Sequence, residues 1–370
     1  MSLIVTPVRR CVAIALLTAC SLIASATVSL NGAICRAEPL VGLMVFGDSL
    51  SDEYFEQSYG SYSRNWVPLL VDERGVNVGP QGSWGEPRRH GYQHNWARAS
   101  ANSSHLVAGL SLFSGQWQSP IIWGQVSHGV LAIGANDFHP TSTAYQSIYD
   151  GTWSQTQIND YVASVRDNID TVVSAIRGTG LPLVLANVLD YGATPSVRNS
   201  YPSATGREAV AAAIMQLNAE IDLLAQQYEL PLADLSGLAR DIFGTHTAMN
   251  SSIEIGGVNI NLLTGGTSAT NAFVADGVHP HTVLQGVIAN LFLTALRRGY
   301  GVEVELFTEE ELLTNANLAY GGVDTLSFDV NDYVLNYVPE PATIGIFALG
   351  AAMALIARRR CVRPAGVVRQ

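Results

Sequence analysis

The chain has 370 residues, of which 48% are hydrophobic and 14% are charged. This composition suits one or two globular domains with a large core, and it excludes a disordered chain. Residues 38–337 contain 30 acidic residues and 12 arginines, a formal charge of −18 with histidine neutral. Such a body repels polyanions, so nucleic acid is excluded as a partner, whereas neutral and cationic substrates remain open.

The amino-terminal segment has the layout of a secretory signal peptide. Arg9 and Arg10 precede an apolar run, residues 11–23, which small residues follow. This pattern predicts export and a signal peptide within residues 1–37. Three processing sites remain open: residues 24–26 (ASA), residues 35–37 (CRA) and the lipoprotein-like residues 17–20 (LTAC).

All four cysteines lie near the two ends of the chain, at Cys11, Cys20, Cys35 and Cys361. The central body therefore has neither a disulfide framework nor a catalytic thiol. We expect its stability to come from an ordinary packed core.

The central body alternates short apolar runs with longer helical patterns. The predicted strands are residues 43–46, 126–133, 181–188 and 230–235, and the predicted helices are residues 157–176, 207–228 and 282–298. This alternation predicts an α/β fold with a mostly parallel sheet flanked by helices. In such sheets the reactive groups gather at the carboxyl ends of the strands, where we expect Ser49 and Asn136.

Two segments lie outside this alternation. Residues 251–263 are predicted to form a hairpin that turns at Gly256 and Gly257. Residues 301–337, which include an acidic helix at 309–313, form either an addition at the sheet edge or a stalk.

The carboxy-terminal segment combines residues 338–341 (VPEP), an uncharged run at 344–357 and three arginines at 358–360. A helix of that run is about 21 Å long, which is short for a hydrocarbon core of ~30 Å, and the arginines would stay cytoplasmic. The order of these parts resembles the PEP-CTERM sorting signal, assigned here to residues 338–370. The resemblance implies recognition by an exosortase, removal of the tail, and delivery to the cell envelope or extracellular matrix. The alternative is a plain single-span anchor.

Three groups of residues in the body have the properties that ester hydrolysis requires: a nucleophile, a proton shuttle and oxyanion donors. Ser49 follows Gly47 and Asp48 in residues 46–52 (FGDSLSD), where the glycine permits a tight turn. Asp276 and His279, in residues 276–280 (DGVHP), have a spacing that can bring a carboxylate beside an imidazole.

A third segment, residues 134–137 (GAND), places an amide donor, Asn136, after Gly134 at a strand end. Taken singly, each segment also has a structural explanation, as a loop cap, a loop histidine beside an acid, or an asparagine capping its own turn.

In this order the three segments resemble the first, third and last blocks of the SGNH/GDSL hydrolases, in particular the lipase/esterase branch. Residues 187–195 (NVLDYGATP) are similar to a further segment of that branch, so the resemblance spans about residues 43–298. It implies a three-layer α/β/α sandwich over residues 38–300 and a serine esterase or lipase mechanism. Ser49 would be the nucleophile, His279 the base and Asp276 the residue that orients it.

The second block departs from the family pattern. Residues 95–101 (NWARASA) resemble it, but Ser100 stands where the family usually has the glycine that lends a backbone N–H to the oxyanion hole. The other donors implied by the resemblance are the N–H of Ser49 and the side chain of Asn136. If the loop requires a positive φ, Ser100 is sterically strained and the hole is distorted.

The remaining polar residues indicate no cofactor. No spacing of His, Asp, Glu or Cys suggests a metal site, and no glycine-rich loop has nucleotide-binding spacing. His281 could in principle replace His279 as the base, but it lacks the three-residue spacing to Asp276. His139 is expected to line the cleft. The aromatic stretches at residues 54–66 and 84–96 are interpreted as the edge of the core, and the alternative is an acyl- or sugar-binding surface.

Three functions fit the sequence. The first is an esterase or lipase acting on small-molecule or lipid esters, and the second is a carbohydrate O-acetylesterase acting on acylated matrix polysaccharide. The third is a surface-displayed binding protein whose catalysis has weakened, with Ser100 as the symptom. The presence of Ser49, Asn136 and the Asp276–His279 pair weighs against the third.

Overall fold

The computed structural model of the protein describes residues 39–86 and 88–339. The predicted signal peptide and the apolar run of the predicted sorting signal lie outside the described residues. In the described part, no helix has both the length and the apolar character that a membrane span requires. The features below all belong to one unit, Glu38–Val338.

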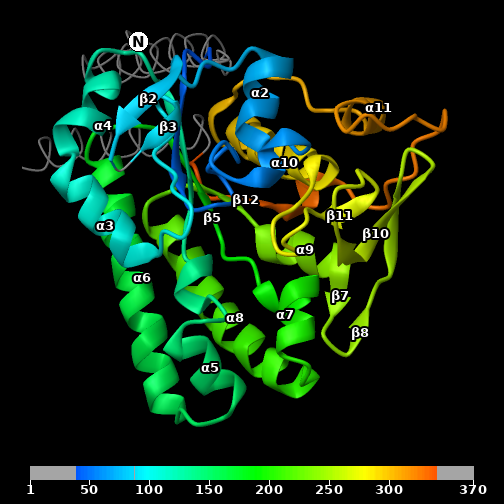
Figure 1. The fold of residues 1–370 in the computed structure, drawn as a ribbon. Coiled ribbons are helices and arrows are strands. Elements are labelled where there is room, and N and C mark those ends of the chain that lie inside the picture. The colour runs from blue at the N-terminus through cyan, green and yellow to red at the C-terminus, as the bar shows by residue number, and fades with distance from the viewer. Residues whose placement is uncertain (1–38, 87, 340–370) are drawn as a thin grey trace, which may run out of the picture. The chain divides into compact units, whose positions relative to one another are not determined.

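A central sheet runs through this unit (Figure 1). Its strands lie in the order β1, β4, β5, β6, β12. The strands are β1 (Leu43–Gly47), β4 (His128–Ala132), β5 (Leu183–Ala186), β6 (Pro231–Ala233) and β12 (Val334–Asn336). The first four are parallel to their neighbours, whereas β12 pairs antiparallel with β6. The mostly parallel sheet predicted from the sequence is confirmed.

Both faces of the sheet are covered, which explains why its strands are apolar at consecutive positions. In β1, Leu43 and Val45 belong to one core, and Met44 and Phe46 belong to the other. The first core includes residues of α2 (Trp66–Arg74), α9 (Leu235–Phe243) and α10 (Thr282–Tyr300). The second includes residues of α3 (Ser103–Leu112), α4 (Ser114–Ile122), α5 (Thr143–Tyr149), α6 (Gln155–Arg177) and α8 (Ala204–Gln227). These layers form the expected α/β/α sandwich.

The long helices follow from the apolar periodicity. In α6 the buried side chains recur every three or four residues, from Val162 to Ile176, which gives the helix one apolar face. Ser154 caps the amino end of α6 and forms a capping box with Gln157. The predicted helices 157–176, 207–228 and 282–298 correspond to α6, α8 and α10.

Short strands form additional pairs outside the central sheet. The predicted hairpin is confirmed: β9 (Ser252–Ile255) pairs antiparallel with β10 (Val258–Gly265), and the two turn glycines have φ of 57° and 79°. β11 (Asn271–Phe273) lies parallel to β10. The other pairs are β2 (Gln81–Gly85) with β3 (Arg89–Tyr92) and β7 (Gly244–Thr245) with β8 (Ala248–Met249).

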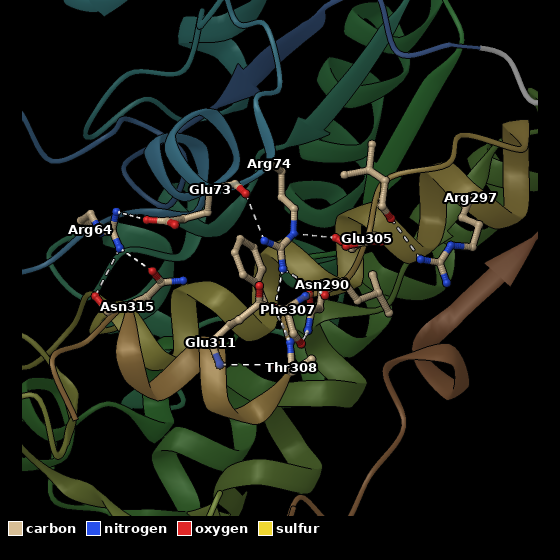
Figure 2. A network of polar contacts seen from close by, with 12 residues as sticks. Arg64, Glu73, Arg74, Asn290, Arg297, Glu305, Phe307, Thr308, Glu311 and Asn315 are labelled. Atoms are coloured by element: carbon tan, nitrogen blue, oxygen red, sulfur yellow. Dashed lines mark hydrogen bonds and ion pairs between the residues drawn. The ribbon is translucent and has the colours of Figure 1, made fainter. Parts of the chain in front are cut away.

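The segment after α10 is attached to the sandwich by a polar network (Figure 2). Arg74 of α2 contacts the carboxylate of Glu311 at 2.6 Å, and its guanidinium lies 4.0 Å from the centroid of the Phe307 ring. Asn290 of α10 both donates to and accepts from the backbone of Phe307. These contacts hold α11 (Glu309–Thr314) beside α2 and α10, and the chain then continues to β12 at the sheet edge.

Candidate active site

Ser49 lies just beyond the carboxyl end of β1, in a tight turn. A Cβ at Gly47 would come within 2.5 Å of the carbonyl oxygen of Ala132, so only glycine lets β1 approach β4 this closely. The turn is closed by two hydrogen bonds to Asp48: its carboxylate accepts from the N–H of Leu50, and its carbonyl accepts from the N–H of Ser51, both at 3.0 Å. Ser49 is 8% exposed.

Asp276 and His279 form a hydrogen-bonded pair, as their spacing predicted. The Nδ1 of His279 lies 2.6 Å from a carboxylate oxygen of Asp276. The other oxygen accepts from the N–H groups of Val278 and His279, at 2.8 and 3.0 Å. Burial raises the pKa of Asp276, but the hydrogen bond and charge of His279 outweigh it, so the net shift of this pKa is downward. The carboxylate is therefore held ionised beside the imidazole.

Ser49 and His279 line one cavity of about 80 Å³, which we call the Ser49 cavity. The Nε2 of His279 is buried and has no hydrogen-bond partner among the described residues, Ser49 included. Catalytic hydrogen bonds are often long before substrate binds, so this separation does not exclude proton transfer. Most of the other lining side chains are apolar: Leu50, Ala135, Leu189, Ala193, Ala239, Phe243, Phe273, Val278 and Pro280.

The segment that contains Ser100 runs alongside β1. The N–H of Trp96 donates to the carbonyl of Val45 at 2.7 Å, and the N–H of Arg98 donates to that of Gly47 at 3.1 Å. Ser100 has φ of +65°, the left-handed conformation that glycine adopts without strain. The loop therefore does require a positive φ at this position, the condition under which the sequence predicted strain, and Ser100 is strained. It does not line the Ser49 cavity.

Asn136 lies after β4, in the 3₁₀ turn Ala135–Phe138. Its amide nitrogen donates to the carbonyl of Ala101 at 3.0 Å, and its amide oxygen accepts from the hydroxyl of Tyr191 at 2.9 Å. An amide nitrogen carries two hydrogens, so one donor remains for another acceptor. Asn136 is thus joined to the Ser100 loop, although it does not itself line the Ser49 cavity.

Two tyrosines that sequence reasoning assigned only to the core edge pack against the His279 ring. Tyr59 is stacked on it, with centroids 5.4 Å apart and planes 26° apart, and the Tyr59 hydroxyl lies 3.2 Å from Nδ1. Tyr54 is edge-on to the same ring at 5.9 Å, and its hydroxyl donates to the carbonyl of Pro280. Both are buried, so the core interpretation holds, but they also fix the imidazole. No periodicity connects residues 54–59 with residue 279.

Buried carboxylates underlie the same region. Burial raises the pKa of Asp48 to about 6, of Asp52 to about 7 and of Glu53 to about 8. Asp52 accepts from the N–H of Ala99 at 2.6 Å, and Glu53 accepts from the side chain of Asn95 at 2.7 Å. Asp52 and Glu53 therefore hold the Ser100 loop in place through hydrogen bonds.

The two other histidines weighed from the sequence, His281 and His139, do not line the Ser49 cavity. His281 is buried at the amino end of α10, where Nδ1 accepts from the N–H of Thr282, and burial lowers its pKa to about 4. His139 packs edge-on against Tyr191 but does not line the Ser49 cavity, so that expectation is wrong. Among the described residues, no group of three or more His, Cys, Asp or Glu could hold a metal ion.

Comparison with protein families gives a match to the GDSL-like lipase/acylhydrolase family over residues 43–292. The chain belongs to this family. The matched region includes Ser49, Ser100, Asn136 and the Asp276–His279 pair, and membership makes the protein a carboxylic ester hydrolase. A second match, to the PEP-CTERM protein-sorting motif, covers residues 338–360. Both resemblances drawn from the sequence are thus confirmed.

Solved structures give weaker similarities to this GDSL-family chain. A lipase from a goat rumen metagenome is 14% identical, with a TM-score of 0.44, over 70% of this chain and 97% of that one. A GDSL-like lipase from Bacteroides thetaiotaomicron is 14% identical, with a TM-score of 0.40, over 73% and 95%. No curated protein matches the chain. The family assignment therefore rests on the match over residues 43–292.

Proposed function

We propose that this GDSL-family protein is an exported serine esterase in which Ser49 is the nucleophile, His279 the general base and Asp276 the residue that orients it. One observation supports the assignment most. The Nδ1 of His279 is bound to Asp276, and Nε2 is buried, without a partner among the described residues, at a cavity that Ser49 also lines.

The chemistry then proceeds through an acyl-enzyme. Ser49 attacks the ester carbonyl while Nε2 of His279 takes the hydroxyl proton, and His279 returns that proton to the leaving alcohol. Water then attacks the acyl-enzyme while His279 takes its proton, and His279 returns that proton to Ser49 as the acid leaves. Asp276 holds Nδ1–H in place throughout and stabilises the imidazolium.

The oxyanion donors in this proposal are the backbone N–H groups of Ser49 and Ser100 and the free hydrogen of the Asn136 amide. Loss of one such donor typically costs about 3–4 kcal/mol in the barrier. The strain at Ser100 therefore bears on the rate rather than on the class of reaction.

The charge of the body and the size of the Ser49 cavity narrow the range of ester substrates. The body carries a formal charge of −18 over residues 38–337, which disfavours polyanionic esters. The Ser49 cavity is small and mostly apolar, which suits a short acyl group. We therefore favour short-chain esters over long-chain lipids.

Export and sorting complete the proposal. Residues 1–37 would direct secretion, and the PEP-CTERM motif would bring the protein to an exosortase-type machinery. The apolar run at 344–357 would serve as a transient anchor in the inner membrane before removal of the tail. The catalytic body would then act in the cell envelope or extracellular matrix.

A fluorophosphonate probe tests the nucleophile directly. We expect covalent labelling at Ser49 and hydrolysis of p-nitrophenyl acetate, both abolished in Ser49→Ala with an unchanged melting temperature. Ser58→Ala is the matched control, because Ser58 is exposed in the same region. Labelling that persists in Ser49→Ala refutes the assignment. Absence of labelling in the folded wild-type protein favours the alternative, a catalytically weak surface binding protein.

A further inference from the structure

A second cavity, of about 230 Å³, lies beside the Ser49 cavity, and we call it the His246 cavity. One face of α8 forms one side, and α9 with the following turn forms the other. Its floor comes from residues after β5 and β6, at the carboxyl edge of the sheet, where ligands of open α/β sheets bind. The polar lining residues are Asn187, Asp190, Glu208, Asn218, Asp234, Ser236, Arg240, Thr245 and His246.

The two cavities share a wall. Asp190, Ala193 and Ala239 line both of them. Asp190 is held in place by the N–H of Gly192, which donates to one carboxylate oxygen at 2.8 Å. The two cavities are therefore adjacent, with Asp190 at their boundary.

His246 supplies a buried polar group that no hydrogen bond from the described part of the chain uses. Its Nε2 lies 2.6 Å from the second oxygen of Asp190, and its side chain is only 6% exposed. Its Nδ1 is buried and has no partner among the described residues. With Nε2–H donating to Asp190, Nδ1 is left as an acceptor for a ligand hydroxyl.

Some of the other polar lining groups have their hydrogen bonds within the protein. Asn218 bonds both backbone groups of Val188, and Asp234 accepts from Asn187 and from the N–H of Gly237. By contrast, three side chains have no hydrogen bond or ion pair with any described residue: Glu208, Ser236 and Arg240. Together with His246 they offer both donors and acceptors.

We propose that the His246 cavity binds the alcohol portion of the ester and that this alcohol is a sugar unit rich in hydroxyl groups. Uncommitted donors and acceptors on opposite walls match vicinal hydroxyls, whereas an alkyl alcohol would leave them unpaired. The lining contains no Phe, Tyr or Trp, so it lacks the aromatic cage that recognises quaternary ammonium alcohols. This inference rests on the proposed esterase function and selects its carbohydrate O-acetylesterase form.

Two acetate esters with equal ring size separate hydroxyl recognition from catalysis. Methyl 6-O-acetyl-glucoside carries ring hydroxyls and cyclohexyl acetate carries none. We expect Glu208→Ala, Arg240→Ala and His246→Ala each to lower kcat/KM for the sugar ester at least tenfold. Activity toward cyclohexyl acetate and p-nitrophenyl acetate should stay within twofold. Glu220→Ala, on α8 outside the cavity, is the control.

The two proposals fail in different ways. Equal effects of the variants on both ring esters, or no effect on either, overturn the sugar site while the esterase stands. If p-nitrophenyl acetate is not hydrolysed at all, the esterase proposal fails. The cavity is then tested by saturation-transfer NMR of methyl glucoside on Ser49→Ala. A signal that disappears in the Ser49→Ala/Glu208→Ala double variant supports the site, and absence of any signal overturns it.

Discussion

Ser100→Gly tests the strain in the loop that is proposed to supply an oxyanion donor. Ser100 has φ of +65° and is exposed, and its hydroxyl makes no hydrogen bond with any described residue. The substitution therefore removes the Cβ without removing a hydrogen bond, and it keeps the backbone N–H.

The magnitude follows from two opposing effects. The left-handed conformation costs a non-glycine residue about 1–2 kcal/mol. Glycine lowers stability by about 0.4–1 kcal/mol, because it gives the unfolded chain more freedom. The expected net change lies between about 0 and about 1.6 kcal/mol of stabilisation, or roughly 0–3 °C in melting temperature. Ser100→Val should destabilise, because a β-branched residue is disfavoured at positive φ.

Thermal melts and esterase kinetics provide the assay. Ser164→Gly is the control for glycine in a helix: Ser164 is exposed in the middle of α6 and its hydroxyl donates to the carbonyl of Tyr161, so glycine there should cost at least about 0.5 kcal/mol. We expect Ser100→Gly to keep kcat equal to or above that of the wild type, and Ser100→Val to lower it. A clear loss of stability in Ser100→Gly, similar to that of the control, would refute the argument from strain.

Three further predictions concern the surroundings of the site. Tyr59→Phe removes the hydroxyl beside Nδ1 of His279 but keeps the stacked ring, so we expect a several-fold loss of kcat with little change in KM, and Tyr59→Leu should lose more. The native pKa of Glu53, about 8, exceeds its ordinary 4.5, so the folded state binds the extra proton between these values and stability should fall as pH rises through this window. Urea titrations at pH 5 and pH 8.5 should detect this fall, and Glu53→Gln should reduce it. Arg74→Ala should destabilise by about 2–4 kcal/mol, whereas Arg166→Ala, which removes ion pairs with the exposed Asp167 and the half-buried Asp170, should cost less than about 1 kcal/mol.

Each of these predictions has an outcome that contradicts it. Wild-type kinetics in both Tyr59→Phe and Tyr59→Leu would mean that neither the hydroxyl nor the stacked ring affects His279. A pH dependence that is unchanged in Glu53→Gln assigns the lost stability to other groups. Equal destabilisation by the two arginine substitutions contradicts the prediction that the Arg74 network contributes more stability than the ion pairs of Arg166.

The sequence predicted the sheet and the main chemistry because both follow short-range patterns. Buried parallel strands appear as continuous apolar runs, and the spacing of Asp276 and His279 brings their side chains together within one turn. From the sequence, strain at Ser100 could be predicted only for the case that the loop requires a positive φ. The sequence does not give that φ, because it depends on how the loop is held against β1. The environment of the His279 ring, with Tyr59 stacked on it, depends on contacts across more than 200 residues of chain, which no local pattern records.

The His246 cavity escaped prediction for a related reason. Its walls come from α8 and α9, and its central pair joins residues 190 and 246, each of which is unremarkable in its own segment. A histidine in a loop after α9 gives no signal by itself. Only the tertiary arrangement puts Asp190 between two cavities.

The position of β12 limits where the chain can be shortened. This strand covers the outer edge of β6, and Arg298 donates to the carbonyls of Asn331 and Val334 to hold it there. β12 ends at Asn336, two residues before the sorting motif begins at 338. Proteolysis within the motif therefore leaves every backbone pair of the sheet intact. Truncation before residue 334 would instead uncover β6 and create a template for self-association.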